Sequence, residues 1–135
     1  MNRFTLALIA HDSKKEDMLH VVKKYQGELS KLDLVATRGT GSIIQGRTGL
    51  SVTLMSSGPQ GGDQQIGALV AQGKVQAVIF LRDPLTAQGH EPDISALLRI
   101  CDVYNVPLAT NPSSAEAMLN SLLQHDYAEP QPTLV

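Results

Sequence analysis

Apolar and polar residues follow one another along this chain in blocks, and five of the apolar blocks have the length of a β-strand. Near-continuous apolar runs of roughly four to eight residues are typical of strands that are covered on both faces. The predicted strands are residues 4–10, 32–36, 50–55, 75–81 and 106–109.

The segments between these strands carry apolar residues at helical spacing. Met18, Val21, Val22 and Tyr25 recur with this period, and the lysines and carboxylates around them mostly take other faces. Helices are predicted at residues 13–29, about 42–47, 63–71, 93–104 and 113–123. Five alternations of strand and helix predict a single α/β domain with a five-stranded, mostly parallel sheet and helices on both faces.

Local signals refine the ends of these elements. Ser13 and Ser113 are each followed three residues later by a glutamate, the pattern of a helix-capping box. The predicted domain covers residues 1–124. Residues 125–135 hold two prolines and little pattern, so they are expected to form a loosely ordered tail.

Composition limits the classes of function. The 135 residues suffice for one domain with a real core, and a formal net charge of −2 with mixed signs argues against a nucleic-acid binder. The single cysteine, Cys101, lies in an apolar helical pattern, which favours a buried thiol and a reducing compartment. Neither a signal peptide nor a membrane-spanning run is evident, so a cytoplasmic protein is expected.

Polar residues follow every predicted strand. In open parallel sheets, ligands bind outside the carboxyl ends of the strands. Capping would account for Asp12 or Thr40 alone, but the clustering of polar groups at one edge predicts a site for a small anion. The five strand ends are His11-Asp12, Thr37-Arg38-Gly39-Thr40, Ser57-Gly58, Arg82-Asp83 and Thr110-Asn111.

Residues 57–65, Ser-Gly-Pro-Gln-Gly-Gly-Asp-Gln-Gln, link the third strand to the next helix. Three glycines allow a tight loop whose backbone N–H groups can face an anion. Asp63 comes where the helix begins. It is equally suited to capping that helix and to acting as an acid or base, and both interpretations stay open.

A phosphate dianion needs hydroxyl and backbone donors together with a positive charge. Thr37, Thr40, Ser57, Gly58 and Lys15 supply such groups at this edge. The chain has no Gly-Lys-Ser/Thr loop and no Gly-x-Gly-x-x-Gly after a strand, so nucleoside triphosphates and dinucleotides are not expected.

Two kinds of chemistry use the remaining acids and histidines. Metal-assisted hydrolysis would use them as ligands, but their spacing matches no known metal motif. Proton transfer next to a carbonyl would use a carboxylate base and a neutral histidine. The candidates are His11, Asp12, Asp63, Asp83, His90 and Asp93.

Four motifs together resemble the methylglyoxal synthase family over about residues 5–120. They are His11-Asp12-x-x-Lys15, the run from Ser57 to Ala68, Asp83-Pro84-Leu85, and His90-Glu91-Pro92-Asp93 with Ala109-Thr110-Asn111. The resemblance implies a Rossmann-like, methylglyoxal synthase-like fold and a hexamer that needs no metal or cofactor. It also implies conversion of dihydroxyacetone phosphate into methylglyoxal and inorganic phosphate, a reaction that belongs to a glycolytic bypass.

The resemblance also assigns roles to residues. Asp63 would abstract the C3 proton to form an enediolate, and His90 would polarise the carbonyl and shuttle protons. Asp12, Asp83 and Asp93 would shape the site. The residues expected to bind substrate, mainly its phosphate, are His11, Lys15, Thr37, Gly39, Thr40, Ser57 and Gly58, with Arg38 and His90 as further candidates.

Two departures from the family pattern bear on these roles. Where the family has Thr-Gly-Thr-Thr-Gly, this chain has Thr37-Arg38-Gly39-Thr40-Gly41, so Arg38 either forks onto the phosphate or points to solvent, with solvent slightly favoured. Some members also contribute a C-terminal arginine to a neighbouring subunit, and after Arg99 this chain has only His125 as a basic residue.

The Thr-x-Gly-Thr form also resembles regulatory domains attached to carbamoyl-phosphate synthetase and to the final enzyme of purine synthesis. The alternative function is therefore a phosphate-ligand binding module without lyase activity. The sequence Gly61-Gly62-Asp63-Gln64-Gln65, together with His90 and Asp93, favours catalysis because such modules have no need of it.

Overall fold

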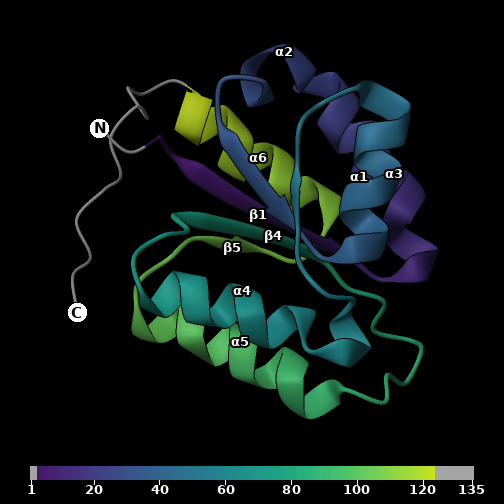
Figure 1. The fold of residues 1–135 in the computed structure, drawn as a ribbon, viewed down its shortest axis with the longest axis vertical. Helices are drawn as coiled ribbons and strands as arrows, with labels where there is room; N and C mark the ends of the chain where they lie inside the picture. The colour runs from purple at the N-terminus through teal and green to yellow at the C-terminus, as the bar shows by residue number, and fades with distance from the viewer. Residues whose placement is uncertain (1–2, 124–135) are drawn as a thin grey trace.

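The computed structural model describes residues 3–123, and within them one sheet of five strands forms the centre of the molecule (Figure 1). Every neighbouring pair of strands is parallel, and their order is β3-β2-β1-β4-β5. The predicted α/β architecture is confirmed. The strands are β1 (Thr5–Ala10), β2 (Asp33–Ala36), β3 (Thr53–Leu54), β4 (Ala77–Leu81) and β5 (Leu108–Ala109).

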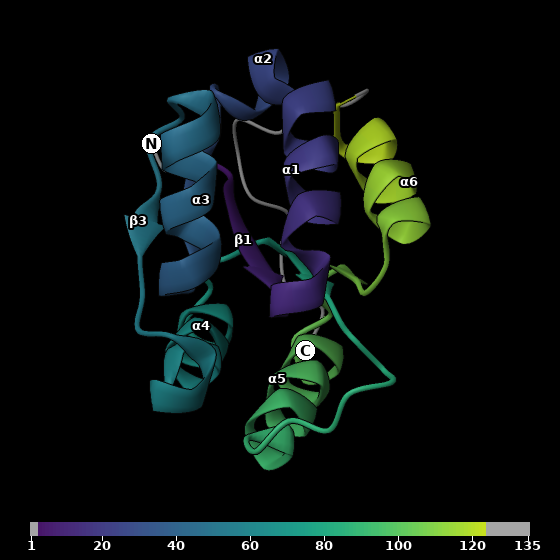
Figure 2. The same ribbon diagram turned by 90° about the vertical axis from the view of Figure 1, so that its right-hand side faces the viewer.

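Helices cover both faces of the sheet. On one face, α1 (Lys15–Lys24) lies between α3 (Arg38–Thr48) and α6 (Pro112–Leu123), as Figure 2 shows, with the short α2 (Gln26–Leu29) at its end. On the other face, α4 (Gly62–Ala71) packs against α5 (Glu91–Val103) (Figure 1). The helices therefore form two layers with the sheet between them.

The central strand β1 serves two hydrophobic cores. Leu6 and Leu8 belong to the core beneath α1, α3 and α6, whereas Ala7 and Ile9 belong to the core beneath α4 and α5. Successive side chains of a strand point to opposite faces, so an apolar run without polar interruptions is what this position requires.

The order in which the chain adds strands to the sheet reverses between β1 and β4. From β1 the chain builds β2 and β3 on one side, and it then returns to place β4 and β5 on the other. Ala10 and Leu81 are paired at the carboxyl ends of β1 and β4, and the next amide, His11 N–H, donates to Leu81 O at 3.1 Å. Ligands of open α/β sheets bind at such a switch point.

Both predicted capping boxes are wrong. The Ser13 hydroxyl donates to Asp83 Oδ2 at 2.7 Å, and a 3-10 turn (Asp12–Lys14) precedes α1. At α6, Asn111 takes the place predicted for Ser113, because its Oδ1 accepts the Ser114 N–H at 2.9 Å. At the start of α1 no side chain takes the capping role, whereas at α6 the neighbouring Asn111 takes the hydrogen bond that the pattern assigned to serine.

Element boundaries also differ from the prediction. The helix expected at 13–29 is interrupted at Tyr25, whose φ and ψ of −111° and 19° are not helical. Helix α3 begins at Arg38, four residues earlier than predicted, and the strands β3 and β5 are each only two residues long. The predicted tail at 125–135 and the domain boundary at 124 lie outside the described residues.

Cys101 is fully buried in α5, as predicted, and burial raises the pKa of its thiol to about 11. Across residues 3–123, no helix combines the length and apolar character needed to cross a bilayer.

Candidate active site

A cavity of about 560 Å³ opens at the switch point, where the carboxyl ends of β1 and β4 meet the starts of α3 and α4. It brings together most of the residues that the sequence singled out. Those that line it are His11, Asp12, Lys15, Thr37, Gly39, Ser57, Gly58, Asp63, Asp83 and His90. Arg38, Thr40 and Asp93 do not line it.

Asp63 lies at the bottom of this site with 1% of its surface exposed. Neither carboxylate oxygen has a hydrogen-bond partner among the described residues. Gly61 occupies the N-cap of α4, so the capping interpretation of Asp63 is wrong. Burial raises the pKa of Asp63, because a charged carboxylate loses its hydration there.

A glycine brings the start of α4 close enough to the loop to bury Asp63. A Cβ at Gly62 would lie 2.0 Å from the backbone oxygen of Ser56, a distance that no side chain can occupy. Gly61 has a φ of 103°, in the left-handed region that glycine adopts without strain. The two glycines thus let the chain turn sharply and place Asp63 within the first turn of α4.

The imidazole of His90 lies close to the Asp63 carboxylate. Its Nε2 lies 3.6 Å from Asp63 Oδ2, and it comes from the residue that precedes α5. The backbone of Gly58 passes close to this pair, since a Cβ there would lie 2.9 Å from His90 Nε2 and 3.4 Å from Asp63 Oδ1. The base candidate and the histidine candidate are therefore side by side.

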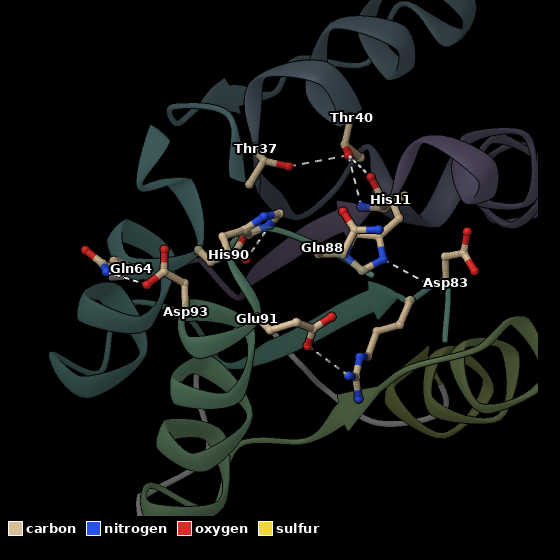
Figure 3. A network of polar contacts seen from close by, with 12 residues as sticks. His11, Thr37, Thr40, Gln64, Asp83, Gln88, His90, Glu91 and Asp93 are labelled. Atoms are coloured by element: carbon tan, nitrogen blue, oxygen red, sulfur yellow. Dashed lines mark hydrogen bonds and ion pairs between the residues drawn. The ribbon is translucent and has the colours of Figure 1, made fainter. Parts of the chain in front are cut away.

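His11 faces His90 from the end of β1, with 6.3 Å between the ring centroids. Its Nδ1 accepts the backbone N–H of Asp83 at 2.8 Å (Figure 3), which leaves the ring proton on Nε2. Nε2 is buried without a partner among the described residues. Burial, then the neighbouring His90 and Arg82, lowers the pKa of His11, so the ring is a neutral donor.

Lys15 supplies the positive charge on the cavity wall. Its ammonium donates to Ala10 O and to Asp12 Oδ1, both at 2.9 Å. The hydrogen bond from Lys15 lowers the pKa of Asp12, so that carboxylate is ionised at neutral pH. No side chain caps the start of α1, so the capping interpretation of Asp12 is wrong. Lys15 also lies beside the start of α3, where a Cβ at Gly39 would be 3.2 Å from Lys15 Cε.

The start of α3 faces the same cavity through Thr37 and Gly39. The first N–H groups of a helix have no intrahelical partner and carry partial positive charge, so they favour an anion. Thr40 instead ties α3 to β1, because its hydroxyl accepts the Ala10 N–H at 3.0 Å (Figure 3). Arg38 is exposed, as the sequence analysis slightly favoured.

The other two aspartates are held by neighbours. Asp83 accepts the Ser13 hydroxyl at 2.7 Å and the Leu85 N–H at 3.0 Å, and hydrogen bonds from Ser13, Thr86 and Leu85 lower the pKa of Asp83 to about 2. Asp93 Oδ1 accepts Gln64 Nε2 at 2.7 Å, and its charge helps to raise the pKa of Asp63.

Several further residues that the sequence did not predict line the cavity. Ile9 and Phe80 are side chains near the ends of β1 and β4, and Thr86, Ala87 and Gln88 belong to the loop between Asp83 and His90. Because both ends of that loop were candidates, its middle could have been included. The described residues contain no group of three or more acids, histidines or cysteines arranged to hold a metal ion.

Comparison with known proteins identifies the family of this chain. A family model for the MGS-like domain matches residues 17–110. The methylglyoxal synthase of Carboxydothermus hydrogenoformans is 61% identical over 117 residues, which cover 87% of this chain and 97% of that protein. The methylglyoxal synthase of a Geobacillus species is 56% identical over 123 residues, 91% of this chain and 88% of that protein.

A solved structure supports the same relationship. The crystal structure of methylglyoxal synthase from Elizabethkingia anophelis superposes with a TM-score of 0.85 at 40% identity, covering 98% of this chain and 85% of that one. Since the family model, the sequence identity and the fold all agree, the chain belongs to the methylglyoxal synthase family.

Proposed function

We propose that this protein is a carbon–oxygen lyase that converts dihydroxyacetone phosphate into methylglyoxal and inorganic phosphate, with Asp63 as the base. The observation that carries this proposal is the buried Asp63 carboxylate, which has no hydrogen-bond partner among the described residues and lies 3.6 Å from His90 Nε2. A carboxylate whose oxygens are not engaged, with a raised pKa, suits proton abstraction.

In the proposed reaction, Asp63 removes a proton from C3, and the electron pair of that C–H bond forms the C2–C3 double bond of an enediolate. His90 and the neutral His11 line the same cavity and would donate hydrogen bonds to the substrate oxygens. The C2–C3 π pair then moves to form a C1–C2 double bond, and the bond between C1 and its oxygen breaks, so that phosphate leaves with that electron pair. The C3 hydroxyl loses its proton and becomes the aldehyde. The resulting enolate takes up a proton at C1 to give methylglyoxal.

The second half of the cavity would hold the phosphate. Lys15, Thr37, Ser57 and the backbone at Gly39 and Gly58 line it together. Their donors match what a dianion needs. The resemblance also gave Thr40 to this half, and Thr40 supports it by tying α3 to β1. Arg38, which departs from the family pattern, is exposed outside the cavity.

Placement of the phosphate would decide the product. An enediolate expels phosphate when the breaking C–O bond overlaps its π system, so a site that holds the phosphate out of the enediolate plane promotes elimination. Asp12 would orient Lys15 through their hydrogen bond. Asp83 would orient the His11 ring through its backbone N–H, and Asp93 would act electrostatically on Asp63 of the proton-transfer pair.

We further propose, from the family, that the protein acts as a cytoplasmic homohexamer in a glycolytic bypass. Gel filtration with light scattering would test the oligomer directly.

The decisive experiment incubates purified protein with dihydroxyacetone phosphate and excess chelator, and follows dicarbonyl product and free phosphate together. We expect equal release of both, which Asp63→Asn abolishes while inorganic phosphate still binds. His90→Gln should depress kcat far more than it weakens substrate binding. If wild-type protein binds phosphate and releases neither product, it is a phosphate-binding module and the lyase assignment is wrong.

A further inference from the structure

Two glutamines follow Asp63 directly in α4, and the mechanism above gives neither of them a task. Both side chains are exposed, so neither contributes to the core. Consecutive helical residues point about 100° apart, which lets neighbours on one helix turn contact different elements. Gln64 and Gln65 do so, because one contacts α5 and the other contacts the loop that leads from β3.

Gln64 reaches the proton-transfer half of the site. Its Nε2 donates to Asp93 Oδ1 at 2.7 Å across the starts of α4 and α5 (Figure 3). Asp93 is half-buried, and the Asp93 N–H donates to His90 O at 3.0 Å. Gln64 therefore holds the carboxylate that is attached through the backbone to His90 and that acts electrostatically on Asp63.

Gln65 reaches the phosphate half. Its Oε1 accepts the backbone N–H of Ser56 at 2.8 Å. The carbonyl of Ser56 in turn accepts the Arg38 N–H at 3.4 Å, so Ser56 links the start of α4 to the start of α3. Ser57, which lines the cavity, comes next along the chain. Loss of the Gln65 acceptor would remove a hydrogen bond that fixes the Ser56 backbone, and with it the position of Ser57 and of the start of α3.

We propose that Gln64 and Gln65 are positioning residues that support the two halves of the site separately: Gln64 through Asp93 beside the Asp63–His90 pair, and Gln65 through the Ser56 backbone beside the phosphate donors. This inference rests on the proposed lyase function. It follows from the opposite roles of the two amides, since Gln64 acts as a donor to a carboxylate and Gln65 acts as an acceptor from a backbone amide.

Gln64→Met and Gln65→Met form a matched pair, because methionine keeps the length and helix propensity of glutamine but offers neither strong hydrogen bond. Gln64→Met should lower kcat by about 10- to 100-fold and leave the inhibition constant of inorganic phosphate unchanged. Gln65→Met should raise KM and that inhibition constant by about tenfold or more, with kcat nearly unchanged. Thermal unfolding of both variants should match wild type.

A second pair tests the polarity of the Gln64 contact. Gln64→Lys keeps a donor for Asp93 and should retain most of the wild-type kcat. Gln64→Glu places a second carboxylate against Asp93 and should lose at least as much activity as Gln64→Met. Equal loss in the lysine and glutamate variants would show that a hydrogen bond donated to Asp93 is not what Gln64 contributes.

The separation of parameters decides the proposal. If both methionine variants change kcat and the phosphate constant together, or change neither while remaining folded, the glutamines do not support separate halves. Failure of the lyase function would be recognised independently, because wild-type protein would then give no product although the binding of inorganic phosphate to Gln65→Met could still be measured by calorimetry.

Discussion

At the scale of single residues, the protonation state of Asp63 dominates the expected pH dependence of kcat/KM. A base must be ionised to accept a proton, and burial holds the pKa of Asp63 above its ordinary value. We therefore predict that kcat/KM falls on acidification at a higher pH than an exposed aspartate would give. The measurement is a pH profile of kcat/KM.

Two comparisons identify the group whose protonation causes the fall of kcat/KM in acid, the acid limb of the profile. Asp83 cannot produce it, because its pKa of about 2 keeps it ionised throughout the range. His11 could contribute, since protonation would change its donor pattern although its pKa is lowered. In His11→Asn the activity should be lower but the limb should stay in place. A limb that disappears in this variant would assign it to His11 instead.

The same burial costs stability. The folded-state pKa of Asp63 is raised above its unfolded value, so its favourable contribution is complete below the unfolded pKa and is lost as pH rises through the folded pKa. Asp63→Asn should therefore unfold a few degrees above wild type at pH 7, about 1 kcal/mol. The gain should shrink in acid. Thermal unfolding of wild type and variant at pH 7 and in acid tests this. An unchanged or lower Tm of the variant at pH 7 would contradict it.

Gly58 illustrates how a residue without a side chain sets the geometry of the site. We predict that Gly58→Ala lowers kcat by on the order of 100-fold, because its Cβ would lie 2.9 Å from His90 Nε2 and would push the ring away from Asp63. The Tm should change little, since the histidine can move. Retention of full activity would mean that the distance between His90 and Asp63 is not critical.

At the scale of elements, the sequence predicted where each strand ends more reliably than where each helix begins. The polar groups after the strands were identified because apolar runs end abruptly there. The start of α3 was missed because Arg38, Gly39 and Thr40 were interpreted as a loop, whereas the structure makes them its first turn. Glycine and threonine are weak helix formers, and tertiary contacts such as the Thr40 bond to Ala10 decide the outcome.

Helix α3 also offers a test within one element. Gly46 has nothing within 4 Å of its missing Cβ, so Gly46→Ala should stabilise the protein by about 0.5–1 kcal/mol. Gly41 has Leu54 Cδ2 at 2.3 Å from the same position, so Gly41→Ala should destabilise it instead. Denaturant unfolding of the two variants measures both signs, and equal effects would refute the packing of α3 against β3.

At the scale of the whole molecule, alternation of strand and helix was sufficient to predict the architecture, and the rule for carboxyl ends was sufficient to predict the edge that carries the cavity. These two rules could not predict which side chains line the cavity. Asp93 and Thr40 were candidate site residues but do not line the cavity. Each is engaged by another element, Asp93 by Gln64 of α4 and Thr40 by Ala10 of β1. Such pairings depend on three-dimensional contacts that no local pattern encodes.

The shared strand β1 predicts cooperative unfolding of both cores. Leu8→Ala on one face and Ile66→Ala on the other remove fully buried side chains, and each should cost about 2–5 kcal/mol. Both should shift one common transition, since β1 contributes side chains to each core. Calorimetry with fluorescence and circular dichroism measures this. Two separate transitions would show that the faces unfold independently.

The position of β4 beside β1 has a consequence during synthesis on the ribosome. β1 can pair with β2 early, but its other edge waits for β4, and the bond between Asp83 and His11 joins residues 72 positions apart. Until β4 emerges, a nascent chain presents an apolar strand with a free row of backbone donors and acceptors. Such an edge recruits other chains, so ribosome-bound fragments that stop before Ala77 should be targets for chaperones and for aggregation.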